Sequence, residues 1–195
     1  PRRVDMFLVE KGISGLERVV YDLNKHEHRS AAFVALNPLA RVPVLELDDG
    51  RYLAESRAIC SYLEMLHPEP NLMGRDPVER AFIEMADRQV ELGLLALIAN
   101  CVRHTHPGLA VLEQPQFPDF GASQGEKMIA AARIFDGLLA RREWMAGDRF
   151  TIADITAFCG LEFGKLVKFR PAEAGLTHLA AWRERVAARP SAAQS

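Results

Sequence analysis

Two short groups of residues in this chain have the types and spacing to hold a small peptide. Pro43 stands directly before an apolar run at residues 44–47, and Glu55 and Ser56 follow after a turn. A proline in this position can leave the neighbouring backbone open to a ligand in extended conformation. If Ser56 opens a helix, its unpaired N–H groups and dipole favour a carboxylate, while Glu55 can pair with an ammonium. Together the two groups favour a ligand held by its backbone and by an amino-acid head group.

Each of these residues also has a simpler structural interpretation. Pro43 could be a turn proline that starts a strand, Ser56 an N-cap and Glu55 a solvated charge. The argument for a site therefore depends on their order and spacing, not on any one of them.

Before residue 68 the sequence predicts a small α/β unit. Val4, Phe7 and Leu8 repeat at helical spacing near the start of the chain. The triplet Asp-Asp-Gly at 48–50 predicts a hairpin, because glycine accepts the positive φ of such turns. Around it we expect strands at 18–21, 44–47 and near 52–53, a short helix at 31–36 and a helix with its apolar face at 59–66.

The segment 68–76 is predicted to be a linker, because Pro68 and Pro70 stop the preceding helix and stiffen the connection. The chain then divides into an α/β domain at 1–67, this linker at 68–76 and an all-helical domain at 77–195.

The second domain is predicted to be helical throughout. Asp76 followed by Pro77 is typical of a helix start, and the apolar pattern beyond it indicates a helix of roughly 25 residues that ends at 104–108. Further helices are expected around 128–139 and 182–186, and no strand signal of comparable strength follows residue 77.

Thr151 and Asp154 predict a helix start inside this domain. Thr151 can accept from the Asp154 N–H while Asp154 accepts from the Thr151 N–H, the reciprocal pattern of a capping box. We therefore expect Asp154 to stabilise a helix terminus by about 1 kcal/mol and not to act in catalysis.

Composition limits the class of partner. The 24 basic and 26 acidic side chains form no block of like charge, so nothing favours nucleic acid or an anionic membrane surface. No apolar run approaches the ~20 residues of a membrane span and no signal peptide is evident, so we expect a soluble, cytoplasmic protein. Cys60, Cys101 and Cys159 are odd in number and far apart, which predicts buried reduced thiols and no metal site.

Three ordered motifs give the chain a specific resemblance. They are NPLARVP at 37–43, ESRAI at 55–59 and AGDRFTIAD at 146–154, with the proline-rich linker between the second and third. In this order they resemble the cytosolic glutathione S-transferase superfamily, of theta-like or atypical yeast type, over essentially the whole chain. The resemblance implies a thioredoxin-like first domain, a helical second domain and a homodimer. It also implies a detoxification enzyme that transfers glutathione to a small hydrophobic electrophile.

The resemblance further assigns parts of glutathione to residues of this chain. In the family the proline equivalent to Pro43 is cis, and the N–H and C=O of the preceding residue, here Val42, pair with the cysteinyl part. Glu55 and Ser56 take the ammonium and the α-carboxylate of the γ-glutamyl group. The glycyl carboxylate needs a cation, for which the candidates are His28, Arg29 and Arg41.

The residue that activates the glutathione sulfur is not evident in the sequence. Members of the superfamily place a Tyr, Ser or Cys between the first strand and the first helix, and Pro1 to Val4 resembles the start of that helix. We therefore expect the first strand and the activating residue to lie upstream of Pro1. A Ser or Tyr there would indicate conjugation by thiolate attack, whereas a Cys would indicate mixed disulfides and reductase work.

A second source of activation is suggested by HTHPGL at 104–109. It resembles a segment of the atypical yeast-type transferases in which a histidine and a serine hold a water that stabilises the thiolate, so His104 and His106 are candidates. Thr105 stands between them and no matching serine can be placed. The structural alternative is a histidine at a helix C-terminus, favoured by the dipole.

The electrophile is expected to bind between the domains, near Met85, Leu92, Cys101 and Phe117 or Phe120, although side chains at helical spacing are usually core. Two other functions stay open. One is a glutathione-dependent reductase, isomerase or dehalogenase on the same fold. The other is a non-enzymatic interaction module, which would bind glutathione weakly or not at all.

Overall fold

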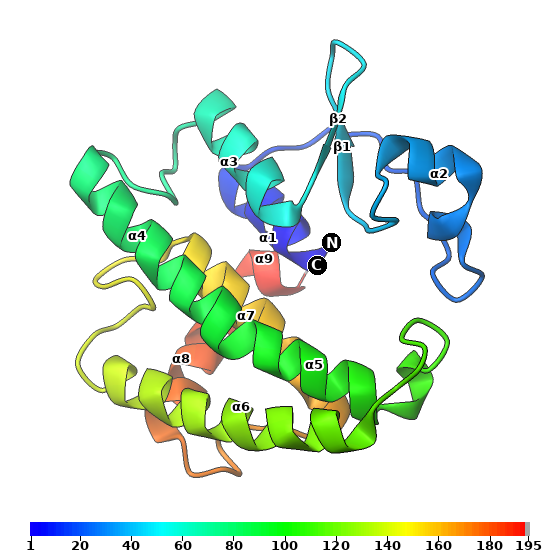
Figure 1. Ribbon diagram of the computed structural model, residues 1–195. Coiled ribbons are helices and arrows are strands. Elements are labelled where there is room, and N and C mark those ends of the chain that lie inside the picture. The colour runs from blue at the N-terminus through cyan, green and yellow to red at the C-terminus, as the bar shows by residue number, and fades with distance from the viewer. Residues whose placement is uncertain (194–195) are drawn as a thin grey trace.

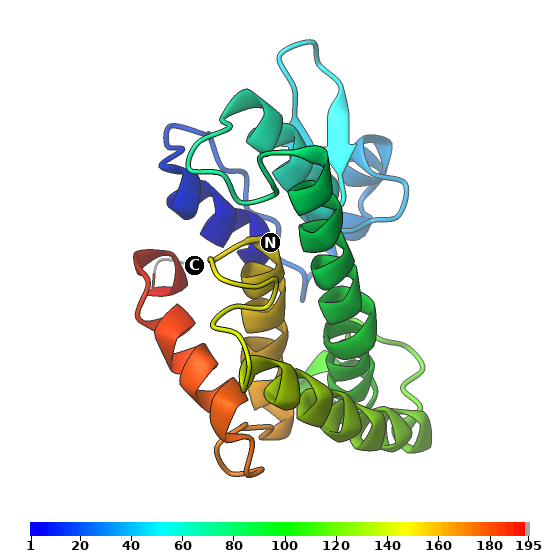
Figure 2. The same ribbon diagram turned by 90° about the vertical axis from the view of Figure 1, so that its left-hand side faces the viewer.

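The computed structural model describes residues 1–193 and joins a small α/β part to a set of longer helices (Figure 1). The α/β part consists of α1 (Arg2–Lys11), η1 (Glu27–Arg29), α2 (Ala31–Leu36), β1 (Val44–Glu46), β2 (Tyr52–Ala54) and α3 (Ser56–Leu66). The helical part consists of α4 (Pro77–Val90), η2 (Glu91–Leu95), α5 (Ala96–Thr105), η3 (Pro107–Leu109), α6 (Pro118–Leu139), α7 (Ile152–Gly164), η4 (Lys165–Val167), α8 (Thr177–Ala187) and α9 (Pro190–Ala193). Helix α9 packs on α1, so the end of the chain returns to its beginning (Figures 1 and 2).

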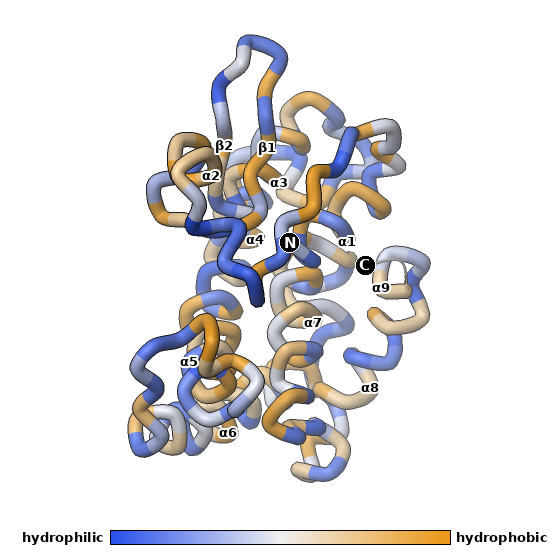
Figure 3. Tube along the Cα trace, turned by 90° about the vertical axis from the view of Figure 1, so that its right-hand side faces the viewer, coloured by the Kyte–Doolittle hydropathy of each residue, from blue (hydrophilic) through white to orange (hydrophobic). Residues whose placement is uncertain are grey.

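The hairpin predicted from the sequence is confirmed. Strands β1 and β2 pair antiparallel, with Val44 opposite Ala54. Gly50 in the turn has a φ of 81° and donates its N–H to the Leu47 carbonyl at 2.9 Å. The tip of the hairpin is hydrophilic (Figure 3), as expected for a turn that projects from the molecule.

The strand predicted at 18–21 is wrong. Val19 and Val20 are 71% and 87% exposed, and the segment adopts no regular structure. The backbone groups of residues 18–21 form no hydrogen bond with the described part of the chain, and a β-strand exists only where a neighbour pairs with it. The segment is instead attached to α1 by an ion pair between Arg18 and Asp5 at 2.8 Å.

The long helix predicted after the linker forms as three consecutive segments. Asp76 caps α4 by accepting from the N–H groups of Val78 and Glu79 at 2.8 and 3.0 Å, and Pro77 occupies the first turn as expected. A π-helical turn, η2, then joins α4 to α5 without breaking the axis (Figure 1). Between residues 77 and 193 we find no strand, only an isolated antiparallel bridge from Trp144 to Gly147.

Helix α7 is the centre of the helical core. It lies between α4 and α5 on one side and α8 on the other (Figure 2), and ten of its residues are buried. The predicted capping box is present at its start, where the Asp154 carboxylate accepts from the Thr151 N–H at 2.9 Å. Among residues 1–193 no helix has the length and apolar character needed to cross a membrane.

The three cysteines are all free thiols. Cys60 and Cys101 are buried as predicted, whereas Cys159 on α7 is only half-buried, with its Sγ 3.8 Å from the Met6 Sδ on α1. Burial raises the pKa of Cys60 to about 12 and that of Cys159 to about 11. Neither therefore forms an appreciable fraction of nucleophilic thiolate at neutral pH.

Candidate functional site

The β1–β2 hairpin brings the two sequence-predicted groups together. Val44 and Ala54 form the last pair of the antiparallel ladder. Pro43 and Glu55 are the next residues on each strand, so both lie at this end of the hairpin. The peptide bond from Val42 to Pro43 is cis. The proline group and the Glu55 group, separated in sequence by the hairpin, thus lie side by side at one end of the sheet.

The backbone of Val42 is available to a ligand. Its N–H and C=O form no hydrogen bond with the described residues, although strand β1 begins two positions later. The preceding loop is held by Asn37, which is 4% exposed: its Nδ2 donates to the Arg41 carbonyl at 2.8 Å and its Oδ1 accepts from the Leu39 N–H at 3.1 Å. A buried amide therefore fixes the loop that presents Val42.

Glu55 has a conformation that few side chains adopt. Its φ of 66° and ψ of 113° lie outside the ordinary regions for a residue with a Cβ, and such conformations are concentrated at functional sites. Its carboxylate is exposed and makes no ion pair with the described residues. An open pocket of about 550 Å³ lies beside it, between α3 and α4. Glu55 is therefore free to pair with a cation that enters this pocket.

Ser56 begins α3, so the first N–H groups of that helix have no intrahelical partner. Its hydroxyl accepts from Nη1 of Arg3, a residue in the first turn of α1, at 3.2 Å. The N-terminal turns of α1 and α3 are therefore one side-chain contact apart. Two converging helix N-termini produce a positive potential that favours an anion.

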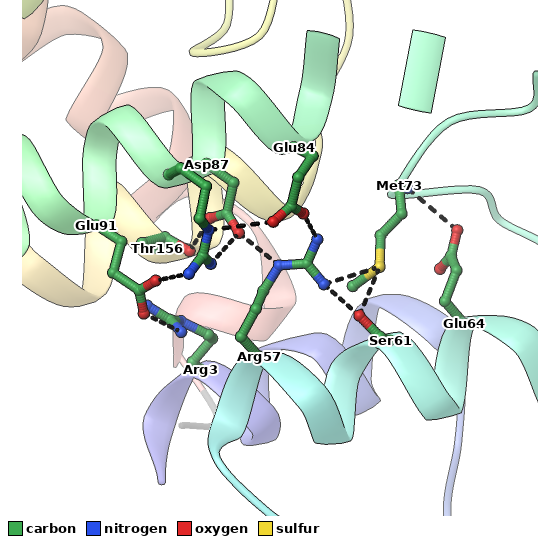
Figure 4. Close-up of polar contacts among 10 residues, drawn as sticks. Arg3, Arg57, Ser61, Glu64, Met73, Glu84, Asp87, Glu91 and Thr156 are labelled. Carbon is green, nitrogen blue, oxygen red and sulfur yellow. Dashed lines mark hydrogen bonds and ion pairs between the residues drawn. The ribbon is translucent and has the colours of Figure 1, made fainter. Parts of the chain in front are cut away.

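Behind these residues lies a charged network that the sequence analysis missed (Figure 4). Arg57 Nε is 2.6 Å from Oδ2 of the fully buried Asp87, and the guanidinium also contacts Glu84 and Ser61. The Thr156 hydroxyl donates to Asp87 Oδ1 at 2.5 Å. The network connects α3 to α4 and α7. Its signal in the sequence is two polar residues on otherwise apolar helix faces, at Asp87 and Thr156.

The three candidates for the glycyl end have different surroundings. His28 is buried and its Nδ1 has no partner among the described residues. Burial, with the nearby charges of Arg29 and His26, lowers the pKa of His28, which favours the neutral imidazole. Arg29 donates from Nη2 to the Leu112 carbonyl at 3.1 Å, whereas the exposed Arg41 makes no side-chain contact with the described residues.

The two candidate histidines after α5 both have structural partners. His104 Nδ1 accepts from the Phe117 N–H at 3.1 Å, which leaves the ring proton on Nε2, 3.9 Å from Glu113 Oε1. His106 Nδ1 accepts from the Gly108 N–H at 3.2 Å. His104 lies in the last turn of α5 and His106 directly follows that helix, and the water-mediated role of either stays a prediction.

The apolar residues expected around the electrophile do not form one group. Phe117 and Phe120 pack on the His104 ring, with centroid distances of 5.9 and 5.1 Å. Met85 and Leu92 lie exposed on α4 and η2, while Cys101 is buried. Phe117 and Phe120 therefore lie beside His104, one of the two predicted histidines. Met85 and Leu92 are not part of this aromatic group.

Comparison with known families accounts for both parts of the chain. The family model described as glutathione S-transferase, N-terminal domain, matches residues 1–66, and the one described as glutathione S-transferase, C-terminal domain, matches residues 111–190.

Individual relatives resemble the chain over nearly its whole length. Glutathione S-transferase 2 of Saccharomyces cerevisiae is 39% identical over 193 residues, covering 98% of this chain and 82% of that protein. The crystal structure of a glutathione S-transferase domain-containing protein from Marinobacter aquaeolei VT8 is 44% identical with a TM-score of 0.92, covering 98% of this chain and 94% of that one. The crystal structure of Gtt2 from Saccharomyces cerevisiae is 39% identical with a TM-score of 0.92, covering 99% and 93%.

Proposed function

This chain belongs to the glutathione S-transferase superfamily, and on that premise we propose how its residues bind glutathione and direct the sulfur to an electrophile. Its fold is that of the family, a thioredoxin-like N-terminal domain with a small two-stranded sheet followed by a helical C-terminal domain. Its relatives are glutathione transferases, which shows that this chain is a glutathione transferase and argues against the non-enzymatic alternative.

The observation that carries the proposed binding mode is the unpartnered backbone of Val42 beside the start of α3. The cysteinyl part of glutathione pairs with the Val42 N–H and C=O as an added strand. This pairing requires no side chain, so it tolerates the thiol at the centre of the ligand. It also fixes the direction of the peptide, with one end toward Glu55 and Ser56.

The γ-glutamyl end is recognised by charge. Its ammonium pairs with the exposed Glu55 carboxylate, which has no ion-pair partner among the described residues. Its α-carboxylate accepts from the Ser56 hydroxyl and from the free N–H groups that open α3. Charge-assisted hydrogen bonds of this kind are about twice as strong as neutral ones.

The glycyl carboxylate is held by the basic residues ahead of β1. We assign the charge to Arg41, whose guanidinium is exposed and makes no contact with residues 1–193, because the lowered pKa of His28 leaves that imidazole neutral and Arg29 is engaged with Leu112. His28 and Arg29 then shape the site without supplying its main charge.

Thiolate formation is supported by the positive potential at the start of α1. A free thiol has a pKa of about 8.5, and helix N–H groups or a nearby guanidinium lower it. His104 and His106 are the second proposed source of activation.

Calorimetric titration with glutathione tests the binding mode. Glu55→Gln should weaken binding by roughly tenfold or more, because it removes a charge-assisted bond worth about 1.5–3 kcal/mol. Glu126→Gln, at an exposed position on α6, is the matched control and should bind as the wild type does. Unchanged affinity of the Glu55 variant would remove Glu55 from the site.

Several finer predictions belong to the same proposal. A panel of electrophiles separates conjugation from the reductase, isomerase or dehalogenase alternatives. Gel filtration tests the homodimer. The cytoplasmic location and the role in detoxification stay predictions from the sequence.

A further inference from the structure

Arg3 lies where both parts of the molecule meet the head-group site. Its side chain is 8% exposed and leaves the first turn of α1. Nη1 donates to the Ser56 hydroxyl at 3.2 Å and to Glu91 Oε1 at 2.8 Å. One contact is to α3 and the other to η2, so a single buried guanidinium joins three elements.

The Glu91 contact is itself held in place. The Glu91 carboxylate also pairs with Arg88, whose Nη2 is 3.0 Å from Asp87 Oδ2. Asp87 in turn holds Arg57 on α3. Arg3 is therefore anchored from the helical domain, and its guanidinium has little freedom to leave Ser56.

The hydrogen bond from Arg3 determines how the Ser56 hydroxyl can act toward a ligand. A guanidinium can only donate, so the Ser56 hydroxyl must accept from Arg3. A hydroxyl has one hydrogen to donate, and no described group accepts it from Ser56. That hydrogen is therefore available to an acceptor at the open N-terminus of α3.

We propose that Arg3 is a positioning residue for the α-carboxylate of the γ-glutamyl group. It holds the Ser56 hydroxyl as a donor and places a buried positive charge behind it, without itself touching the ligand. This inference rests on the proposed function, since it assigns a role within the same glutathione site.

A structural role alone predicts something different. Arg149 is a suitable comparison, because its guanidinium also joins segments that are distant in sequence. It contacts Glu79 on α4 at 2.7 Å and Asn71 in the linker. It contacts none of the proposed ligand-binding residues. Replacing either arginine should lower stability, but only Arg3 should alter recognition of one ligand group.

The test uses two ligands that differ in that group. Glutathione and 4-aminobutyryl-cysteinyl-glycine share the ammonium, the thiol and the glycyl end, and only glutathione has the α-carboxylate. Dissociation constants are measured by calorimetry for the wild type, Arg3→Met, Ser56→Ala, the double variant and Arg149→Met, below the unfolding temperature of each.

Arg3→Met should weaken glutathione binding about tenfold and leave binding of the truncated ligand within about twofold. The double variant should bind glutathione no more than about threefold more weakly than Ser56→Ala, because Arg3 acts through Ser56. Arg149→Met should leave both dissociation constants unchanged. If Arg3→Met does not fold, Arg3→Lys serves instead, since the lysine side chain is one bond shorter and its ammonium does not reach the position from which Nη1 contacts both Ser56 and Glu91.

Equal weakening of both ligands, or fully additive losses in the double variant, would overturn the role of Arg3. A wild type that binds no glutathione would overturn the proposed function and this inference together. Weakening by Ser56→Ala but not by Arg3→Met would reject Arg3 alone.

Discussion

Asp154 shows how burial and hydrogen bonding compete over one carboxylate. It accepts from the N–H groups of Met145 and Thr151, both at 2.9 Å, from the Thr151 hydroxyl at 3.2 Å and from the Trp182 indole at 2.8 Å. Burial is the larger influence and raises the pKa of Asp154 to about 6, while these donors act in the opposite direction. The residue therefore holds the start of α7, the loop before it and α8 together, which is more than the predicted cap.

Asp154→Asn should lower the free energy of unfolding by about 1–3 kcal/mol at pH 7, because the amide directs an N–H group at donors that need an acceptor. The folded-state pKa is about 6 against 3.8 for an ordinary aspartate. The contribution of this titration to wild-type stability is therefore complete below pH 3.8 and is lost as the pH rises through about 6.

Urea unfolding of both proteins from pH 4 to pH 7 measures this difference. The stability advantage of the wild type over the asparagine variant should shrink as the pH rises across the window. An advantage that stays constant or grows would contradict a raised pKa.

At the scale of elements, the contact between α5 and α6 depends on one glycine. A Cβ on Gly121 would lie 2.6 Å from Thr105 Cγ2 and 2.9 Å from His104 Cβ. Glycine therefore allows α6 to approach the end of α5, where His104 packs against Phe117 and Phe120. Apart from its chain neighbours and the nearby backbone of its own helix, no atom of the described residues lies within 4 Å of the Cβ position at Gly137, on the same helix.

Gly121→Ala should lower the free energy of unfolding by about 1–3 kcal/mol, because overpacking forces the two helices apart. Gly137→Ala should raise it by about 0.5–1 kcal/mol, since alanine loses less backbone entropy in a helix. Chemical unfolding compares the two, and equal effects of both changes would show that the helix contact tolerates a methyl group.

At the scale of the whole molecule, the end of the chain is attached to its first helix. Glu10 on α1 accepts from Arg189 at 2.8 and 2.7 Å and from the Ser191 hydroxyl at 2.5 Å. Arg189 also lies 3.9 Å above the ring of Phe150. Burial raises the pKa of Glu10, but the hydrogen bonds from Arg189 and Ser191 outweigh it, so the net pKa is lowered.

Glu10→Gln should lower the free energy of unfolding by about 1–2 kcal/mol at pH 7, because it leaves Arg189 without its anion. Since the folded-state pKa lies below 4.5, this stability is complete above pH 4.5 and is lost as the pH falls through the folded value. The wild-type advantage should therefore shrink on acidification, opposite in direction to the Asp154 comparison.

Thermal unfolding between pH 3 and pH 7 provides the measurement, with Glu126→Gln as the control at an exposed position. The control should stay within about 0.5 kcal/mol of the wild type at every pH. A Glu10 effect that is independent of pH would indicate that the carboxylate charge is not what holds the C-terminal segment.

Features that depend on residues close together in the sequence could be predicted from the sequence alone. The turn at 48–50, the cap at Asp76 and the capping box at Asp154 each depend on residues within a few positions of one another. The proximity of Val42 and Glu55 was also within reach, because a single hairpin connects them. In each example the physical cause lies inside a short segment.

The rest was decided by tertiary structure. Residues 18–21 have strand-forming side chains, but a strand needs a neighbour, and its absence from the described chain leaves Val19 and Val20 exposed. No local sequence pattern around Asp87 identifies its partner, Arg57, which is 30 residues away in the chain. Arg3 likewise meets Ser56 and Glu91 only after three helices have packed, and the direction of the Ser56 proton follows from that packing. The sequence alone thus predicted the groups that we propose to recognise glutathione, whereas packing decided which buried charges lie behind them.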